Sequence, residues 1–198
     1  MASSPDRYEW RAFGANFGIV EQRLRARAQL QKIAESQDIY VLSRRVSTLN
    51  VKLRNHQLDR KRLVANHGPL ELWSPMEKLP LPLSPDQVNQ HLLAPLGAAP
   101  ALTGEQPLGI DELLHQVIYP NTGLVVVHLF KRRWHFTLGG CVCEMAELLV
   151  NGAALSTVCI EATDPDAVIA LAADLRLDDW PNRSYVAALR QVVGLTPP

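Results

Sequence analysis

Charged side chains recur at alternate positions in several segments that have the residue types of strands. Because alternate residues of a strand share one face, each segment would present its charges together: Lys52 with Arg54, Asp59 with Lys61, and Lys131 with Arg133. Paired cations of this kind bind oxygen-rich anions such as phosphates. The spacing therefore predicts a cationic surface or cavity that holds a phosphorylated anion.

These charged faces can point in either of two directions. If they point outward, they form the solvated surface of an exposed sheet. If they point into a barrel, the buried charge must be compensated. The compensation would come from Glu9, Glu144 and Glu161, or from a bound polyanion.

The composition is that of an ordinary globular chain. Its 198 residues carry 20 Lys and Arg against 20 Asp and Glu, so the net charge does not argue for nucleic acid or a membrane as partner. No apolar run reaches the roughly 18 residues of a membrane span, and the first residues lack the pattern of a signal peptide. We therefore expect a cytoplasmic protein, of unspecified oligomeric state. Cys141, Cys143 and Cys159 lie in apolar strand-like segments and are predicted to be reduced core residues.

Strand-like segments dominate the chain. Alternating, branched or aromatic runs predict strands at 8–13, 38–42, 50–54, 58–63, 70–73, 124–136, 141–150 and 155–162. From Phe17 to Ile33 the apolar residues recur near helical spacing, with Asn16 as the N-cap. So many strands without regular alternation with helices favour an antiparallel sheet or barrel in an α+β domain.

The proline-rich segment 75–110 is predicted to be the least ordered part of a single domain, 1–198, as an insertion or connection. Within it, Ser84, Pro85 and Gln87 have the pattern of a helix start, which predicts a helix over 85–93. Further helices are expected at 111–118, from the Asp164-Pro165 start to about residue 175, and from about residue 182 to Gly194.

The order of these segments resembles the CYTH superfamily, also called the triphosphate tunnel metalloenzymes. That family runs from an acidic first strand through a helix to an aspartate-x-tyrosine strand, a basic strand and a strand with a lysine, followed by basic and acidic strands and a C-terminal serine-tyrosine pair. The matching residues here are Glu9, Asp38-Ile39-Tyr40, Lys52-Leu53-Arg54, Lys61, Lys131-Arg132-Arg133, Glu144 with Glu147, Glu161 and Ser184-Tyr185. The resemblance implies an antiparallel eight-stranded tunnel with flanking helices.

The resemblance also implies roles for the charged residues. Basic side chains would grip a triphosphate, and carboxylates would hold Mg²⁺ or Mn²⁺ beside it, which is the arrangement that phosphoryl transfer needs. The phosphate-binding residues would be Lys52, Arg54, Lys61, Lys131 and Arg133, joined by Arg11, and the metal ligands would be Glu9, Glu144 and Glu161.

The first strand departs from the family's ExExK pattern. It carries Glu9, Arg11 and Phe13, so arginine replaces a metal-binding carboxylate and phenylalanine replaces a lysine. In the last strand Cys159 stands where one of two paired glutamates is expected. Because an arginine repels a metal ion yet binds a phosphate, these changes favour phosphate binding over metal-dependent hydrolysis.

Two kinds of function are compatible with these residues. The first is a basic tunnel that binds a small phosphorylated anion, namely a triphosphate, a nucleotide or an organic polyphosphate, with a metal-dependent triphosphatase as its enzymatic form. The alternative is a non-catalytic polyphosphate- or nucleotide-binding regulatory module, or a protein-interaction domain that docks through 75–110.

Overall fold

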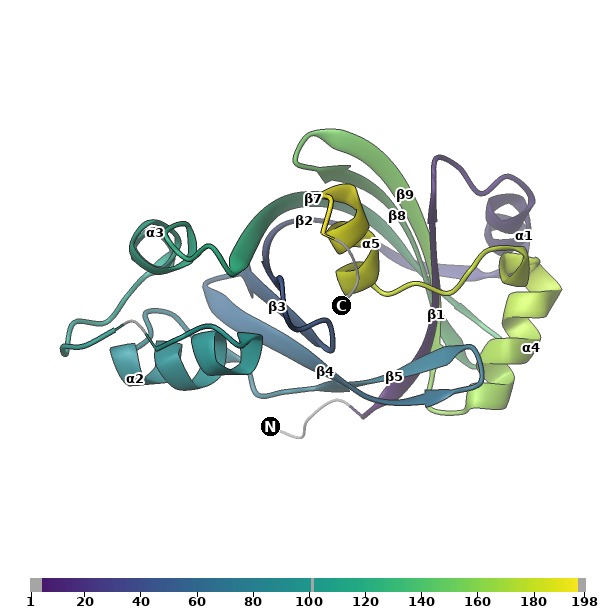
Figure 1. Ribbon diagram of the computed structural model, residues 1–198. Coiled ribbons are helices and arrows are strands. Elements are labelled where there is room, and N and C mark those ends of the chain that lie inside the picture. Colours follow the sequence, from purple (N-terminus) through teal and green to yellow (C-terminus); the bar gives the residue numbers. More distant parts are fainter. Residues whose placement is uncertain (1–4, 101, 196–198) are drawn as a thin grey trace.

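Eight antiparallel strands form a closed ring in the computed structural model, which describes residues 5–100 and 102–195 (Figure 1). The order around the ring is β3-β2-β7-β8-β9-β1-β5-β4, and β4 pairs again with β3. Two-residue β6 (Leu79–Pro80) adds to β4. The predicted α+β fold, an antiparallel eight-stranded barrel with flanking helices, is confirmed. The strands are β1 (Arg7–Gly14), β2 (Gln29–Ser43), β3 (Leu49–Arg54), β4 (Gln57–His67), β5 (Leu70–Pro75), β7 (Leu124–Leu138), β8 (Cys141–Val150) and β9 (Ala153–Ala162).

The alternation along β1 shows how the ring separates charged from apolar residues. Glu9 and Arg11 point into the barrel, whereas Trp10 and Ala12 point out and join an apolar cluster under two helices. These helices are α1 (Ile19–Arg27) and α4 (Pro165–Leu175), which lie together on the outside of the barrel (Figure 1). As predicted, Asp164 caps α4.

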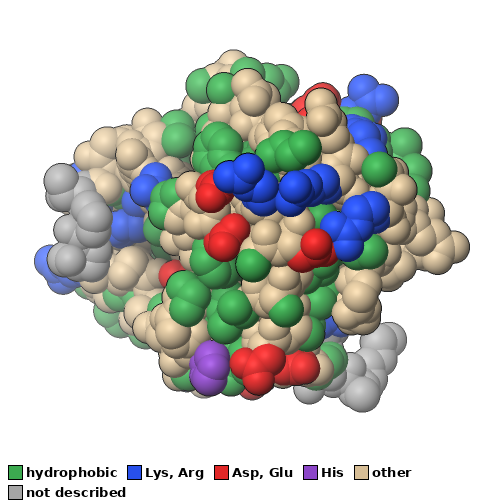
Figure 2. All heavy atoms as spheres, turned by 90° about the vertical axis from the view of Figure 1, so that its right-hand side faces the viewer, with side chains coloured by type: hydrophobic (Ala, Val, Ile, Leu, Met, Phe, Trp, Pro, Cys, Tyr) green, Lys and Arg blue, Asp and Glu red, His purple; other side chains and the backbone are tan. Residues whose placement is uncertain are grey.

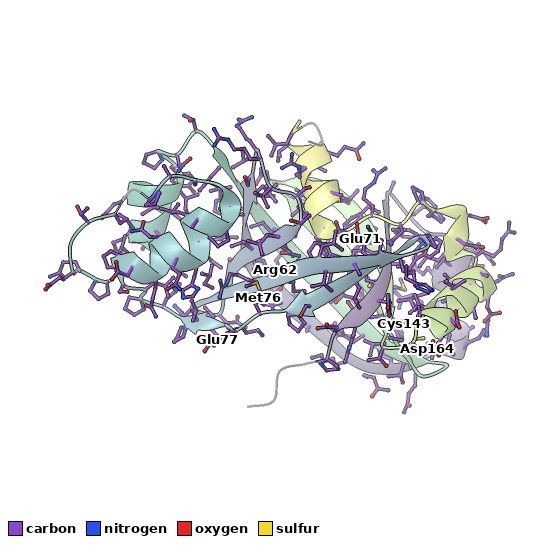
Figure 3. The ribbon with its side chains drawn as sticks, turned by 60° about the horizontal axis from the view of Figure 1, so that its bottom comes forward. Arg62, Glu71, Met76, Glu77, Cys143 and Asp164 are labelled. Atoms are coloured by element: carbon purple, nitrogen blue, oxygen red, sulfur yellow. The ribbon has the colours of Figure 1, made fainter. Side chains whose placement is uncertain are left out.

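The three cysteines are free and buried, as predicted. Cys143 lies on the outer face of the barrel wall close to α4 and Asp164 (Figure 3), and burial raises the pKa of its thiol to about 12. A protonated thiol in an apolar cluster is a packing residue.

The helix predicted from Phe17 to Ile33 is wrong in its second half. α1 ends at Arg27, its N-cap is Gly18 instead of Asn16, and the chain becomes strand β2 at Gln29. The expected strand over 38–42 is only the end of this 15-residue strand. The reason is a tertiary contact. Strand β7 is as long as β2 and pairs with it along its length, so hydrogen bonds between the two strands replace the hydrogen bonds of a helix.

The segment between β5 and β7 packs against the outside of the barrel, opposite α1 and α4 (Figure 1). It contains α2 (Pro85–Val88), a π-helical turn over 89–93, α3 (Ile110–Glu112) and a second π-helical turn over 113–118. The Ser84–Gln87 capping box forms as predicted. Most of its described leucines are buried against β3 and β4, so the segment is packed on the barrel. That it is the least ordered part stays a prediction, and residue 101 lies outside the described residues.

Helix α5 (Tyr185–Val192) fills part of the barrel interior (Figure 1). It begins three residues after the predicted start at 182, because Ser184 is its N-cap. Tyr185, Val186 and Leu189 pack among inward-facing residues of β2 and β7 such as Leu42 and Val127. The barrel interior therefore has an apolar part that α5 fills and a charged part beside it.

Charges on the outer face over α1 and α4 lie beside charges of opposite sign (Figure 2). Arg25 pairs with Glu21 at 2.8 Å, and Arg27 pairs with Asp174 at 2.5 Å. Exposed pairs of this kind contribute little to stability. Among the described residues, none of the helices is long and apolar enough to cross a membrane.

Candidate anion-binding site

A cavity of about 290 Å³ occupies the charged part of the barrel interior. Every residue predicted for the site lines it, so the structure decides that the charged strand faces point inward and that the exposed-sheet interpretation is wrong. The predicted residues on its wall are Glu9, Arg11, Lys52, Arg54, Lys61, Lys131, Arg133, Glu144 and Glu161. Their assignment to phosphate or metal stays a prediction.

Positive charge exceeds negative charge on the cavity wall. Eight basic side chains line the cavity against four carboxylates, because Arg7 and Lys78 add to the predicted cations and Asp59 adds to the predicted acids. Buried charge without a partner is costly. The lining carboxylates are therefore too few to balance the lining cations, and additional negative charge is needed in the cavity.

The cations gather on one side of the cavity, which we call the cationic half: Lys52, Arg54, Lys61, Lys78 and Lys131. Its carboxylates are shared among them. The same oxygen of Asp59 lies 2.6 Å from Arg54, 3.5 Å from Lys52 and 3.9 Å from Lys78.

The second carboxylate of the cationic half is Asp38, which lies behind the cavity wall. Its side chain is fully buried, 3.0 Å from Lys131 and 4.0 Å from Arg54. Lys61 makes no ion pair within 4 Å among the described residues. Four of the five cations therefore share two carboxylates, whereas Lys61 acts electrostatically on Glu9 and Glu161.

Burial changes the protonation of the two lysines deepest in the cavity. Burial lowers the pKa of Lys131 to about 7, against the opposing effect of Asp38. It likewise lowers the pKa of Lys52 to about 8, although Asp59 acts in the opposite direction. An anion bound beside these amines would favour their charged forms.

Tyr40 of β2 and Tyr185, the first residue of α5, form the floor of the cavity, where it borders the apolar part of the barrel interior. Lys131 donates a hydrogen bond of 2.8 Å to the hydroxyl of Tyr40, and its ammonium lies 4.0 Å from the ring centre of Tyr185. The buried hydroxyl of Tyr185 and Nε of Arg133 have no hydrogen-bond partner among the described residues. Both atoms are donors that belong to residues of the cavity wall.

The opposite side of the cavity holds three carboxylates around one guanidinium, which we call the carboxylate cluster: Glu9, Glu144 and Glu161 with Arg11. Arg11 donates from Nε to Glu9 at 2.9 Å and from Nη1 to Glu144 at 3.2 Å. Its Nη2 lies 3.7 Å from Glu161. All three carboxylates predicted to hold a metal ion therefore contact the same arginine.

Asn182 holds the backbone of this cluster in place. Its side-chain oxygen accepts from the backbone N–H of Arg11 at 2.7 Å, and its amide donates to the carbonyls of Glu9 at 3.1 Å and Pro69 at 2.8 Å. One side chain from the segment before α5 thus connects β1 with the turn before β5.

The protonation of the carboxylates follows from these contacts. Burial alone would raise the pKa of Glu9, but Arg11 and Lys61 outweigh it and lower the pKa to about 2. Burial and the neighbouring Glu9 raise the pKa of Glu161. For Glu144 the effect of burial is outweighed by Arg11 and Lys131, which lower its pKa. Glu9 and Glu144 are therefore anions that Arg11 stabilises.

The residues of the carboxylate cluster do not fit a Mg²⁺ or Mn²⁺ site. Such ions need several oxygens directed at one point, whereas these oxygens are directed at a guanidinium. Ligand atoms of Glu9, Cys159 and Glu161 lie within 4.8 Å of one another. However, burial raises the pKa of the Cys159 thiol well above its usual value, so this sulfur is protonated and a poor ligand for a hard cation.

Several residues of the site were absent from the predicted set. Arg7 could have been found, since it alternates with Glu9 and Arg11 on the same strand. Asp38 and Tyr40 belong to the aspartate-x-tyrosine pattern of one strand, but that pattern assigns them no role in the site. Lys78 gives no periodic signal, because it lies outside a strand.

Neither a scan against protein-family models nor a search of curated proteins found a match to the sequence. Solved structures do match. PH1012 from Pyrococcus horikoshii OT3 aligns with a TM-score of 0.55 and 15% identity, over 91% of this chain and 97% of that chain. A conserved hypothetical protein from Pyrococcus furiosus, Pfu-838710-001, aligns with a TM-score of 0.53 and 16% identity, over 91% and 98% of the chains. At these identities the likeness shows a shared fold and no more.

A third structure belongs to a protein with a described activity. HpAC1 from Hippeastrum, for which a dominant triphosphatase activity is described, aligns over 98% of this chain and 97% of its own with 12% identity. Its TM-score is 0.49, so this likeness carries no inference about the activity of the present chain.

Proposed function

We propose that this protein binds a triphosphate or a similar short polyphosphate, free or as part of a nucleotide, in the cationic half of its barrel. The observation that carries the proposal is the ratio of charges on the cavity wall, eight basic side chains against four carboxylates. Arg7 and Lys78 are exposed at 38% and 51%, whereas Lys52 and Lys131 are buried deep in the cavity. Buried cations that outnumber the nearby acids are stabilised by an anion of matching charge.

The arrangement of the cations supports a polyphosphate over a single phosphate. One phosphate group carries a charge of only about −2, which is less than the excess of three cations that remains when Asp38 is counted with the four lining carboxylates. Moreover, the cations come from separate strands: Lys52 from β3, Lys61 from β4 and Lys131 from β7. A chain of phosphoryl groups can contact all three strands at once.

Binding is tested by calorimetry with sodium tripolyphosphate, ATP and inorganic phosphate. The informative variant is Lys61→Gln, because Lys61 makes no ion pair among the described residues and its removal leaves no buried carboxylate alone. Loss of one charge-assisted contact of about 1.5 kcal/mol should weaken tripolyphosphate binding roughly tenfold. Arg132→Gln is the matched control, since Arg132 lies between two cavity residues of β7 but its side chain is about half exposed.

The proposal is wrong if tripolyphosphate neither releases heat nor stabilises the protein, with or without Mg²⁺. It is equally wrong if Arg132→Gln weakens binding as much as Lys61→Gln. Released phosphate is measured in the same samples with Mg²⁺ or Mn²⁺ present. Release that depends on Glu161 would extend the proposal from binding to hydrolysis.

A further inference from the structure

We propose that Arg11 takes the place of a divalent cation in the carboxylate cluster, so that the cavity holds its anion without a metal ion. The anion in this statement rests on the proposed function, whereas the exclusion of metal by Arg11 can be tested without any anion.

The geometry of the cluster supports this substitution. Nε, Nη1 and Nη2 of Arg11 each approach a different carboxylate, those of Glu9, Glu144 and Glu161, at 2.9 to 3.7 Å. The contact with Glu9 has the length of a charge-assisted hydrogen bond, the contact with Glu144 is a longer hydrogen bond, and the contact with Glu161 is an ion pair. A metal ion that used the same oxygens would have to occupy the space of the guanidinium.

The local charge is already balanced without a metal. Arg7 lies 3.7 Å from Glu161, and Arg133 lies 3.9 Å from Glu144. Together with Arg11, three guanidinium groups face the three carboxylates. A divalent cation would add two positive charges to a cluster that is neutral, next to the cationic half.

Arg11 is also held so that it cannot easily leave. Its side chain is only 4% exposed and contacts Thr157, and its guanidinium lies 4.5 Å from the ring centre of Tyr185. Removing one partner from a buried ion pair is strongly destabilising, because it leaves a buried charge without compensation. A metal ion would have to offset this cost before it gained any binding energy.

The consequence for the anion is electrostatic. Because Arg11, Arg7 and Arg133 together balance the three carboxylates, these acids do not repel a polyphosphate in the cationic half, and no metal is required as a bridge. The expected ligand is thus a metal-free polyphosphate, contacted by lysine and arginine alone.

The first experiment measures Mn²⁺ binding without anion, by electron paramagnetic resonance of free Mn²⁺. The native protein should show no saturable site. Arg11→Gln removes the guanidinium and leaves the three carboxylates, so it should bind one Mn²⁺ at least about tenfold more tightly than the native protein. Arg132→Gln should behave like the native protein. A saturable Mn²⁺ site in the native protein that Glu161→Gln abolishes would overturn the inference.

Arg11→Gln could fail to fold, because it leaves three buried acids with fewer cations. In that case, Mn²⁺ should restore the folding of the variant, as followed by circular dichroism. The melting temperature of the native protein should not change when Mn²⁺ is added. A native protein that Mn²⁺ stabilises through Glu161 contradicts the inference whatever the variant does.

The second experiment separates this inference from the proposed function. The affinity for tripolyphosphate is measured in EDTA and in Mg²⁺, and the native protein should bind in EDTA. Binding only with Mg²⁺ or Mn²⁺ would refute the metal-free inference and leave the proposed function standing. Absence of tripolyphosphate binding under both conditions would refute the proposed function. The Mn²⁺ titration without anion would still test whether Arg11 excludes a metal ion.

Discussion

Anion binding in this cavity should take up protons from solution, because the two lysines nearest its floor are only partly charged when the cavity is empty. The pKa is about 7 for Lys131 and about 8 for Lys52. A polyphosphate that contacts both amines raises both pKa values. Each lysine that is neutral before binding must then gain a proton, so affinity falls as the pH rises.

The size of this effect follows from the two pKa values. At pH 8 about 90% of Lys131 and about half of Lys52 are neutral, so binding should take up roughly 1.4 protons, against about 0.1 at pH 6. By the same linkage, affinity should fall roughly 1000-fold between pH 6 and pH 9.

The assay is calorimetry of tripolyphosphate binding in buffers with different enthalpies of ionisation. The native protein is compared with Lys52→Met, in which Asp59 keeps Arg54 and Lys78 as partners. Protons exchanged by tripolyphosphate itself cancel in the difference. Removal of the Lys52 charge also raises the pKa of Lys131, so the variant should take up at least about 0.5 fewer protons at pH 8. Equal uptake by both proteins, or an uptake near zero in the native protein at pH 8, would refute the reasoning.

Two further predictions concern stability. Asp38→Asn removes the buried partner of Lys131 and should lower the free energy of unfolding by about 3 kcal/mol at pH 6. The loss should be smaller at pH 8.5, where Lys131 is neutral. Equal urea midpoints for the variant and the native protein at pH 6 would contradict this prediction. Asn182→Ala removes three hydrogen bonds and should cost about 2 kcal/mol in urea unfolding. Asn16→Ala, at the predicted N-cap that the helix does not use, serves as its control and should leave the urea midpoint unchanged.

Local sequence patterns predicted much of the barrel wall. Alternation placed Lys52 with Arg54 and Lys131 with Arg133 on shared faces, because a strand has only two faces. The structure shows that these faces point inward. Short-range capping patterns also held at Ser84 and Asp164. Such signals are set by neighbours in the sequence.

The predictions failed where distant segments decide the structure. Leu30 and Ile33 have helical spacing, yet they are about half exposed on β2, where pairing with β7 determines the conformation. The contacts of Arg11 could not be predicted for the same reason. They depend on the register that places Arg11 opposite Cys159, and this pairing joins residues almost 150 positions apart.

The position of β1 in the ring has a consequence for how the protein folds. β1 pairs on one side with β5 and on the other with β9, so the ring closes only after almost the whole chain is available. Barrels with such distant pairings fold slowly, in milliseconds to seconds. Until β9 arrives, Glu9 has Arg11 and Lys61 as neighbouring cations, but Glu144 and Glu161 have no cation from β1. The charged interior is therefore completed late in folding, and the same ion pairs that shape the ligand cavity also favour closure in the correct register.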